Sequence, residues 1–142
     1  MGRILSIDYG AKRTGLAVTD ILKIAANPLE TVPTASLANY LTGYFAREDV
    51  ESVVIGAPRQ ADNTPSENMA RVESFIRKFR TLFPAVPIVT YDERFTSVLA
   101  HRAIIDGGVK RSGRRDKALV DRVSAVIILQ SYLESIQYKN QL

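Results

Sequence analysis

The chain has 142 residues, of which 46% are hydrophobic, and this size and composition suit one compact domain, residues 1–142, with its own core. It contains no cysteine and a single histidine, His101, which excludes a disulfide framework, a thiolate metal site and a multi-histidine zinc site. Any divalent metal must therefore be held largely by oxygen ligands, and the net charge of +4 permits a nucleic-acid partner without requiring one.

The start of the chain carries no recognisable targeting segment. Met1 leads directly into the first apolar run, and no basic segment followed by a long apolar stretch precedes it, so no secretory signal is predicted. No uninterrupted apolar stretch approaches the length of a transmembrane helix. A cytoplasmic protein without a membrane partner is therefore expected.

The first predicted strand leads into an acidic residue. Ile4–Ile7 is a short apolar run with β-branched residues, which is typical of a buried strand. Asp8 follows this run and Gly10 marks a turn, so the Asp8 carboxylate is expected where a rigid strand meets an open cleft, a placement suited to a catalytic group. An acidic strand end before an ordinary turn is the alternative interpretation, because Asp and Gly are common in turns.

A basic turn and two further strands follow. The turn carries Lys12 and Arg13, and Leu16–Val18 then begins a second apolar run that is expected to fold back beside the first. Ile24–Val32 is predicted as a third strand, and Pro28 within it indicates a sheet edge or a bulge.

The rest of the chain alternates predicted helices and strands. In order, they are a helix capped by Ser36 and reaching about Ala46, a strand over Val50–Ile55, a helix with apolar residues from Met69 to Leu82, a strand over Val86–Tyr91, a helix with apolar residues from Val98 to Ile105, and a last helix from about Ala118 to Tyr138. Short turns favour antiparallel pairing among the first three strands, whereas strands separated by helices favour parallel crossovers. The predicted fold is therefore an α/β fold, a mixed five-stranded sheet whose last two strands are parallel to the first, with helices on both faces.

Acidic residues lie at the ends of elements that can meet at one edge of this sheet. Asp8 ends the first strand, Asp92 and Glu93 follow the last one, and Asp121 lies near the start of the final helix. Carboxylates packed together repel one another unless a cation neutralises them, and Mg²⁺ or Mn²⁺ suits a set of oxygen ligands. Two such ions about 4 Å apart can activate a water and stabilise the leaving oxygen in phosphodiester cleavage. The alternative is that these acids form ordinary ion pairs with neighbouring cations.

The sequence leaves the choice between Asp92 and Glu93 open. Alternation along the strand places the two on opposite faces, so only one can face the cleft fully. Ser124 and Ala125 follow Asp121 on the same helical face, and small side chains there allow the helix to approach the sheet closely.

A basic, glycine-containing segment, residues 107–117, precedes the final helix. Its cations are Lys110, Arg111, Arg114, Arg115 and Lys117. Such a segment can supply phosphate contacts near a scissile group, although a solvated charge run is the commoner meaning of such a stretch. Both interpretations can hold together, because a segment that is disordered when free can become ordered on nucleic acid.

Four motifs, in their order and spacing, resemble the YqgF family, which is also described as a family of Holliday junction resolvases or pre-16S rRNA nucleases. They are Asp8–Ala17 (DYGAKRTGLA), Gly56–Pro58 (GAP), Asp92–Ser97 (DERFTS), and Lys117 together with Asp121–Gln130 (DRVSAVIILQ). The family usually has a leucine where Ala57 stands, which is a conservative difference. Together the motifs span nearly the whole chain.

The resemblance implies a ribonuclease H-like fold, similar to that of the bacterial junction resolvase RuvC. It also implies a metal-dependent nuclease with a carboxylate site at Asp8, Glu93 and Asp121, which holds Mg²⁺ or Mn²⁺, expected as two ions, with Asp92 as the alternative to Glu93. Structured RNA, in processing of the 5′ end of pre-16S rRNA, is favoured as substrate over branched DNA. A monomer or weak homodimer is expected.

The expected nucleic-acid contacts come from cations beside these carboxylates. They are Lys12, Arg13, Arg94, Lys110, Arg111, Arg114, Arg115 and Lys117.

Two other classes of function remain open. Phosphate-binding ATPases of the actin and sugar-kinase type also begin with Asp-x-Gly, but they clamp the nucleotide between two such domains, and 142 residues provide only one. The other class is a catalytically silent nucleic-acid-binding or ribosome-assembly module, against which the carboxylates argue weakly. A metal-dependent cleavage assay on RNA and junction DNA separates the three.

Overall fold

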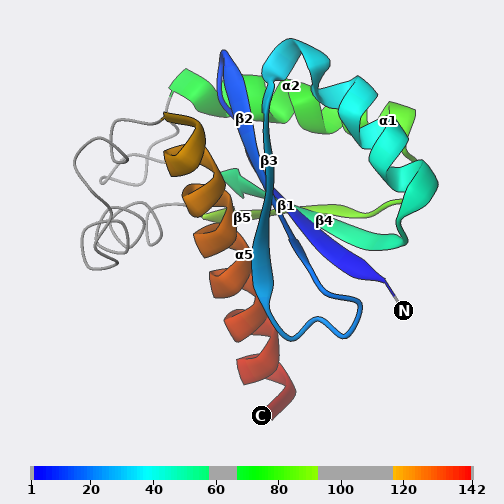
Figure 1. Cartoon of the computed structure of the whole chain (residues 1–142), viewed down its shortest axis with the longest axis vertical. Helices are drawn as coiled ribbons and strands as arrows, with labels where there is room; N and C mark the ends of the chain where they lie inside the picture. Colours follow the sequence, from blue (N-terminus) through cyan, green and yellow to red (C-terminus); the bar gives the residue numbers. More distant parts are fainter. Residues whose placement is uncertain (1, 58–66, 93–116, 142) are drawn as a thin grey trace.

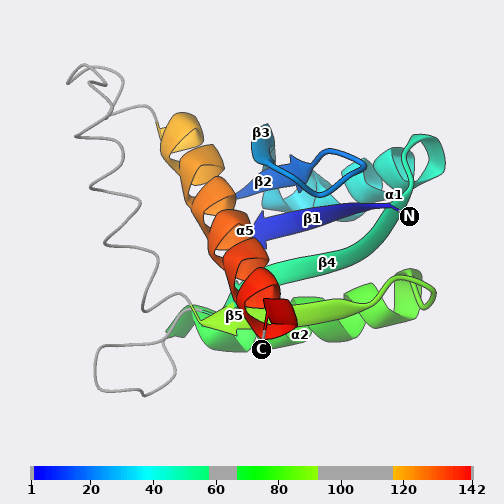
Figure 2. The ribbon, with the colours of Figure 1, turned by 90° about the horizontal axis from the view of Figure 1, so that it is seen from below.

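A computed structural model of the chain describes residues 2–57, 67–92 and 117–141 (Figure 1). The five strands are β1 (Arg3–Asp8), β2 (Arg13–Thr19), β3 (Ala26–Pro33), β4 (Val50–Ala57) and β5 (Ile88–Asp92), and they form one sheet in the order β3-β2-β1-β4-β5. Strand β2 pairs antiparallel with β1 and β3, whereas β4 pairs parallel with β1 and β5. The predicted mixed sheet is therefore confirmed, and β1, β4 and β5 run in one direction (Figure 2).

Helices cover both faces of the sheet, as the sequence predicts. The described helices are the short 3₁₀ helix η1 (Thr34–Ser36), α1 (Leu37–Arg47), α2 (Glu67–Leu82) and α5 (Lys117–Gln141). Helices α1 and α2 pack on one face, and α5 lies on the other (Figure 1). The helix predicted around Val98 to Ile105 lies outside the described residues. Within the described ranges, no helix has the length and apolar character needed to cross a membrane.

Two local details differ from the sequence prediction. Helix α1 begins directly after Ser36, but the Ser36 side chain makes no capping hydrogen bond, because η1 leads into the helix and the first backbone N–H bonds within that turn. Strand β3 begins at Ala26 instead of Ile24. The carboxylate of Asp20 accepts hydrogen bonds from the backbone N–H groups of Leu22, Ile24 and Ala25, and these bonds fold the stretch into the turn of the β2–β3 hairpin.

The face under α1 and α2 holds the larger core. Phe79 is fully buried there, and its ring contacts three other phenylalanine rings at centroid distances of 5.0 to 6.1 Å. Strand residues Leu5, Ile7 and Ile55 point into the same cluster. Large apolar side chains at helical and strand spacing therefore account for how this layer packs.

The face under α5 holds a smaller core. Ile4, Ala17 and Val54 from the strands meet α5, whose buried contacts are Ala125, Ile128, Leu129 and Leu133. Several of these side chains are small, so α5 comes close to the backbone of β1 and β2. This approach places the start of α5 beside the carboxyl end of β1.

Candidate active site

Gly15 in β2 lies directly against the backbone of α5. A Cβ atom at this position would fall inside van der Waals contact with the carbonyl group of Asp121. The glycine in the motif Asp8–Ala17 is therefore needed for the close approach of strand and helix, beyond any role in the turn.

A hydrogen bond fixes the register of α5 against β1. The hydroxyl of Ser6 donates to the carbonyl oxygen of Ala125 at 2.7 Å, and both groups are buried. Two residues further along β1 is Asp8, on the same face of the strand as Ser6, and one turn back along α5 is Asp121. The distance from Ser6 to Asp8 along the strand is about 6.6 Å, and the distance from Ala125 to Asp121 along the helix is about 6.0 Å. The two aspartates therefore lie nearly equally far from the bond between Ser6 and Ala125.

The pairing of β1 with β2 brings the backbones of the same two aspartates to one glycine. Asp8 lies directly opposite Gly15 in the antiparallel register, and Gly15 touches the backbone of Asp121. Residues opposite each other in such a ladder have Cα atoms about 4.5–5.5 Å apart. The backbones of Asp8 and Asp121, two of the three predicted metal ligands, therefore lie on either side of Gly15.

Arg13 forms an ion pair with one of these carboxylates. Its Nε donates to Oδ2 of Asp121 at 2.5 Å, and the Asp121 side chain is only 18% exposed. A short charge-assisted hydrogen bond of this kind neutralises a largely buried carboxylate. Arg13 and Gly15 share a face of β2, so strand alternation predicts that they contact the same partner, but the sequence does not name that partner.

A pocket of about 280 Å³, called here the turn pocket, opens beside this ion pair. Its lining consists of Gly10, Ala11, Lys12, Arg13 and Asp121. Lys12 is exposed at its rim, and Asp121 contributes the acidic group. The pocket therefore combines a carboxylate with two cations at the carboxyl end of β1, which is a suitable environment for a phosphate group and a divalent metal.

Asp92 ends β5 at the same edge of the sheet but on the other face from Asp8. Ile88, which is on the same face of β5 as Asp92, belongs to the core under α1 and α2. Tyr91, on the other face of β5, packs edge-on against Tyr132 of α5 at a centroid distance of 6.3 Å. Asp8 has the parity of Ser6 and so lies on the α5 face. The two aspartates are therefore on opposite sides of the sheet.

The remaining predicted site residues fall outside the described part of the chain. They are Glu93, Arg94, Lys110, Arg111, Arg114 and Arg115, and Lys117 is placed only by its backbone as the first residue of α5. Among residues 2–57, 67–92 and 117–141, no group of three acidic or histidine side chains is close enough to hold a metal ion. Asp8 and Asp121, whose backbones meet at Gly15, nevertheless carry the oxygen ligands that Mg²⁺ prefers.

Comparison with known proteins supports a single family. The family model described as RuvX, Holliday junction resolvase, matches residues 2–135. A protein of Parabacteroides distasonis named "Putative pre-16S rRNA nuclease" is 54% identical over 98% of this chain and 99% of its own length. A protein with the same name from Porphyromonas gingivalis is 56% identical over 95% of this chain and 98% of its own length.

Solved structures share the fold at low sequence identity. RuvC of Thermus thermophilus in complex with a Holliday junction substrate has a TM-score of 0.56 and 14% identity, with coverage of 95% of this chain and 98% of that one. The fowlpox virus resolvase in complex with Holliday junction DNA has a TM-score of 0.51 and 16% identity, with coverage of 93% and 99%. The predicted RuvC-like, ribonuclease H-like fold is thereby confirmed.

Proposed function

Because the chain belongs to the RuvX family, we propose that it is a metal-dependent nuclease that hydrolyses phosphodiester bonds. The observation that carries the proposal is the meeting of Asp8 and Asp121 at Gly15, at the carboxyl ends of parallel strands. Ligand and catalytic sites of open α/β sheets are found at such ends. We propose that residues 1–142 form a single nuclease domain.

The proposed metal ligands and catalytic groups are Asp8, Glu93 and Asp121. Asp8 lies on the α5 face of the sheet, and Tyr91, two residues before Glu93 in the sequence, also faces α5. Asp92 lies on the opposite face, which favours Glu93 as the third ligand. Mg²⁺ or Mn²⁺, proposed as two ions, would supply an activated water and stabilisation of the leaving oxygen when bound.

The protein's own cations have separate tasks in this proposal. Arg13 neutralises Asp121 and holds its carboxylate in position, so the acid is already oriented toward the turn pocket. Lys12 at the rim of that pocket is a phosphate contact. Arg94 and the cations of residues 107–117 are proposed as further contacts to nucleic-acid phosphates.

The proposed substrate is the 5′ end of pre-16S rRNA. The protein is proposed to be cytoplasmic and to act as a monomer or weak homodimer. The names of relatives that match over nearly the whole chain support this choice of substrate. Branched DNA is the second candidate, because the family model carries the description of a Holliday junction resolvase. A catalytically silent assembly factor would retain binding without cleavage.

Cleavage assays on four carboxylate variants test the site. With Mg²⁺ present, Asp8→Asn, Asp121→Asn and Glu93→Gln should each lower the rate of cleavage roughly 1,000-fold or more, because each removes part of the charge that binds metal. Asp92→Asn is the matched control and should cleave at nearly the wild-type rate. The assay uses a pre-16S 5′-end RNA and a four-way DNA junction in parallel.

Calorimetric titration with Mn²⁺ gives a second readout that does not depend on turnover. The three site variants should bind Mn²⁺ more weakly than wild type. The thermal unfolding temperature of Asp8→Asn should stay equal or rise, since removing a like charge relieves repulsion. That of Asp121→Asn should fall, because the variant loses its ion pair with Arg13. Wild-type cleavage by Asp8→Asn would refute the metal mechanism. A larger loss in Asp92→Asn than in Glu93→Gln would reverse the assignment of the third ligand.

A further inference from the structure

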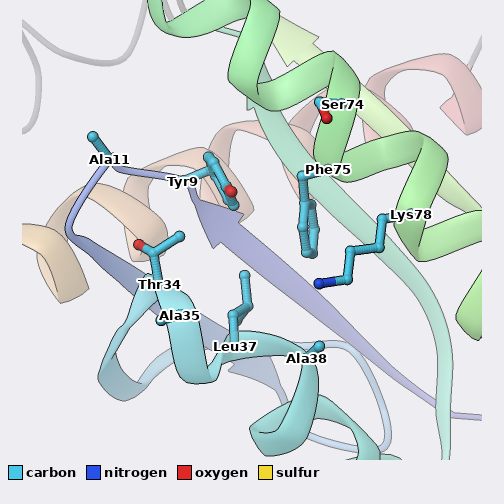
Figure 3. A pocket seen from close by; sticks show the side chains of 9 residues that line it. All are labelled: Tyr9, Ala11, Thr34, Ala35, Leu37, Ala38, Ser74, Phe75 and Lys78. Carbon is cyan, nitrogen blue, oxygen red and sulfur yellow. The ribbon is translucent and has the colours of Figure 1, made fainter.

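A second pocket lies on the opposite side of the β1–β2 turn from Asp121. It occupies about 360 Å³ between the end of β1, the start of α1 and the middle of α2 (Figure 3). We call it the aromatic pocket, and the side chains that matter here are Tyr9, Ala11, Ala35, Ala38, Phe75 and Lys78. Its volume lies within the range of about 300–1,000 Å³ that is typical of small-molecule sites.

One wall of the aromatic pocket is a pair of fixed rings. Tyr9 stacks on Phe75 with a centroid distance of 4.9 Å and an angle of 29° between the rings. Phe75 is buried in the core, and the carbonyl oxygen of Tyr9 accepts a hydrogen bond of 2.8 Å from the amide of Asn68. The hydrogen bond to Asn68 fixes the backbone of Tyr9, and the stacking on Phe75 fixes its ring. The Tyr9 ring is therefore a rigid aromatic surface.

The other walls leave space and add a few polar groups. Ala35 and Ala38 line the pocket with methyl groups only, which leaves space in it. Lys78 reaches from α2 toward the α1 side, and Ser74 lies one helical turn before it (Figure 3). The pocket also holds one ammonium group and the hydroxyls of Tyr9, Thr34 and Ser74, and that of Thr34 is already bonded to Gly10 and Thr14. A flat apolar wall with these few donors suits a planar heterocycle with polar edges better than a phosphate, which needs several donors.

The aromatic pocket is contiguous with the candidate active site. Ala11 lines both the aromatic pocket and the turn pocket that contains Asp121. Asp8 and Tyr9 are neighbours in the chain, and alternation sends their side chains to opposite faces of the sheet. A polynucleotide whose phosphate lies at Asp8 and Asp121 can therefore cross the Gly10–Ala11 turn and bring a neighbouring base to the Tyr9 ring.

We propose that the aromatic pocket binds one unstacked nucleobase of the strand that is held at the carboxylates. The base stacks on Tyr9, and Lys78 and Ser74 contact its polar edge. Recognition of this kind acts on unpaired or extruded nucleotides, whose faces and edges are accessible. The inference rests on the proposed nuclease function and adds the requirement that a nucleotide next to the cleaved bond be unpaired.

Filling the pocket tests the proposal. Ala38→Leu places a larger side chain in the aromatic pocket, and Ala46→Leu makes the same change at an exposed position of α1 that does not line it. Both changes are made in the Asp8→Asn background, so that the strand stays intact during the measurement. Ala35→Leu fills the pocket from η1 and serves as a second variant if Ala38→Leu unfolds.

Fluorescence anisotropy with a labelled single-stranded RNA, and with DNA of the same sequence, measures binding. Ala38→Leu should weaken affinity roughly tenfold, the size expected for losing one base–aromatic stack, while Ala46→Leu leaves it unchanged. A series of strands with one abasic nucleotide at successive positions gives the decisive comparison. At one position the abasic strand should bind the Ala38→Leu and Ala46→Leu proteins equally.

The outcomes distinguish failure of the base-binding proposal from failure of the proposed nuclease function. If both pocket-filling variants bind every strand as the control does, or lose affinity equally for intact and all abasic strands, no base occupies the aromatic pocket. In either case the proposed nuclease function stands. If the wild-type protein cleaves neither the RNA nor the DNA junction in the Mg²⁺ assay, the proposed function itself fails and the inference with it.

Discussion

The two faces of the sheet differ in the size of the side chains that pack on them. The face under α1 and α2 is filled by large side chains such as Phe75, Phe79 and Leu41, and these hold the helices away from the strands. The face under α5 carries Gly15 and small side chains such as Ala17, and the helix backbone reaches the sheet. Burial of large side chains therefore stabilises the packing of α1 and α2 on the sheet. The close approach of α5 to the sheet positions the acidic residues on the other face.

The separation of these roles means that stability and site geometry can be changed independently. A cavity under α1 and α2 leaves the contact between β1 and α5 in place, because the sheet lies between them. A single methyl group between β2 and α5 acts on the carboxylates directly. Three substitutions test this contrast.

The largest loss of stability is expected from Phe79→Ala. The side chain is fully buried among aromatic rings, so its removal should lower the free energy of unfolding by about 3–5 kcal/mol. Leu82→Ala on the same helix is the control, and it should have a much smaller effect because Leu82 is 48% exposed. Denaturant unfolding followed by circular dichroism measures both, and Mn²⁺ titration of the folded protein should show no change. Equal losses in the two variants would contradict the account of this core.

Gly15→Ala should have a smaller effect on stability and a larger one on the site. The added methyl group overlaps the backbone of Asp121, so α5 must shift, at a cost of about 1–3 kcal/mol in the free energy of unfolding. Mn²⁺ affinity and the rate of cleavage should fall together, because Asp121 moves away from Asp8. Gly43→Ala in α1 is the control.

At Gly43 an added methyl group meets only the end of the Arg47 side chain, at 3.9 Å. This control should raise the free energy of unfolding by up to about 1 kcal/mol, because alanine is the better helix former. Normal Mn²⁺ binding by Gly15→Ala would show that α5 need not touch β2 for the carboxylates to meet.

The smallest expected effect comes from Ser6→Ala. The change removes the buried hydrogen bond to the carbonyl of Ala125 and should lower the free energy of unfolding by about 1 kcal/mol. Ser36→Ala is the matched control, since Ser36 is exposed and makes no side-chain capping bond, and its effect should be close to zero. Thermal unfolding of both variants in parallel resolves the difference. A greater loss at Ser36 would place a capping role there after all.

Local patterns were sufficient to predict the sheet and the positions of its acids along the chain. Short turns between strands predict antiparallel pairs, and intervening helices predict parallel pairs. The position of Asp8 at a strand end can be predicted from a few neighbouring residues. The contacts of Arg13 and Gly15 with Asp121 could not be predicted in the same way, because they depend on how α5 crosses the sheet. The face occupied by Asp92 likewise became clear only from the core into which Ile88 packs.

The ion pair between Arg13 and Asp121 joins residues 108 positions apart in the chain. Contacts of such separation form late, because a long loop has to close before they gain any energy, whereas the β1–β2 and β2–β3 hairpins need only short loops. On the ribosome, strands β1 to β4 emerge well before α5 is synthesised. A nascent chain from which α5 has not yet emerged therefore carries Asp8 without Asp121, and the proposed cleavage centre can be assembled only after α5 has been synthesised.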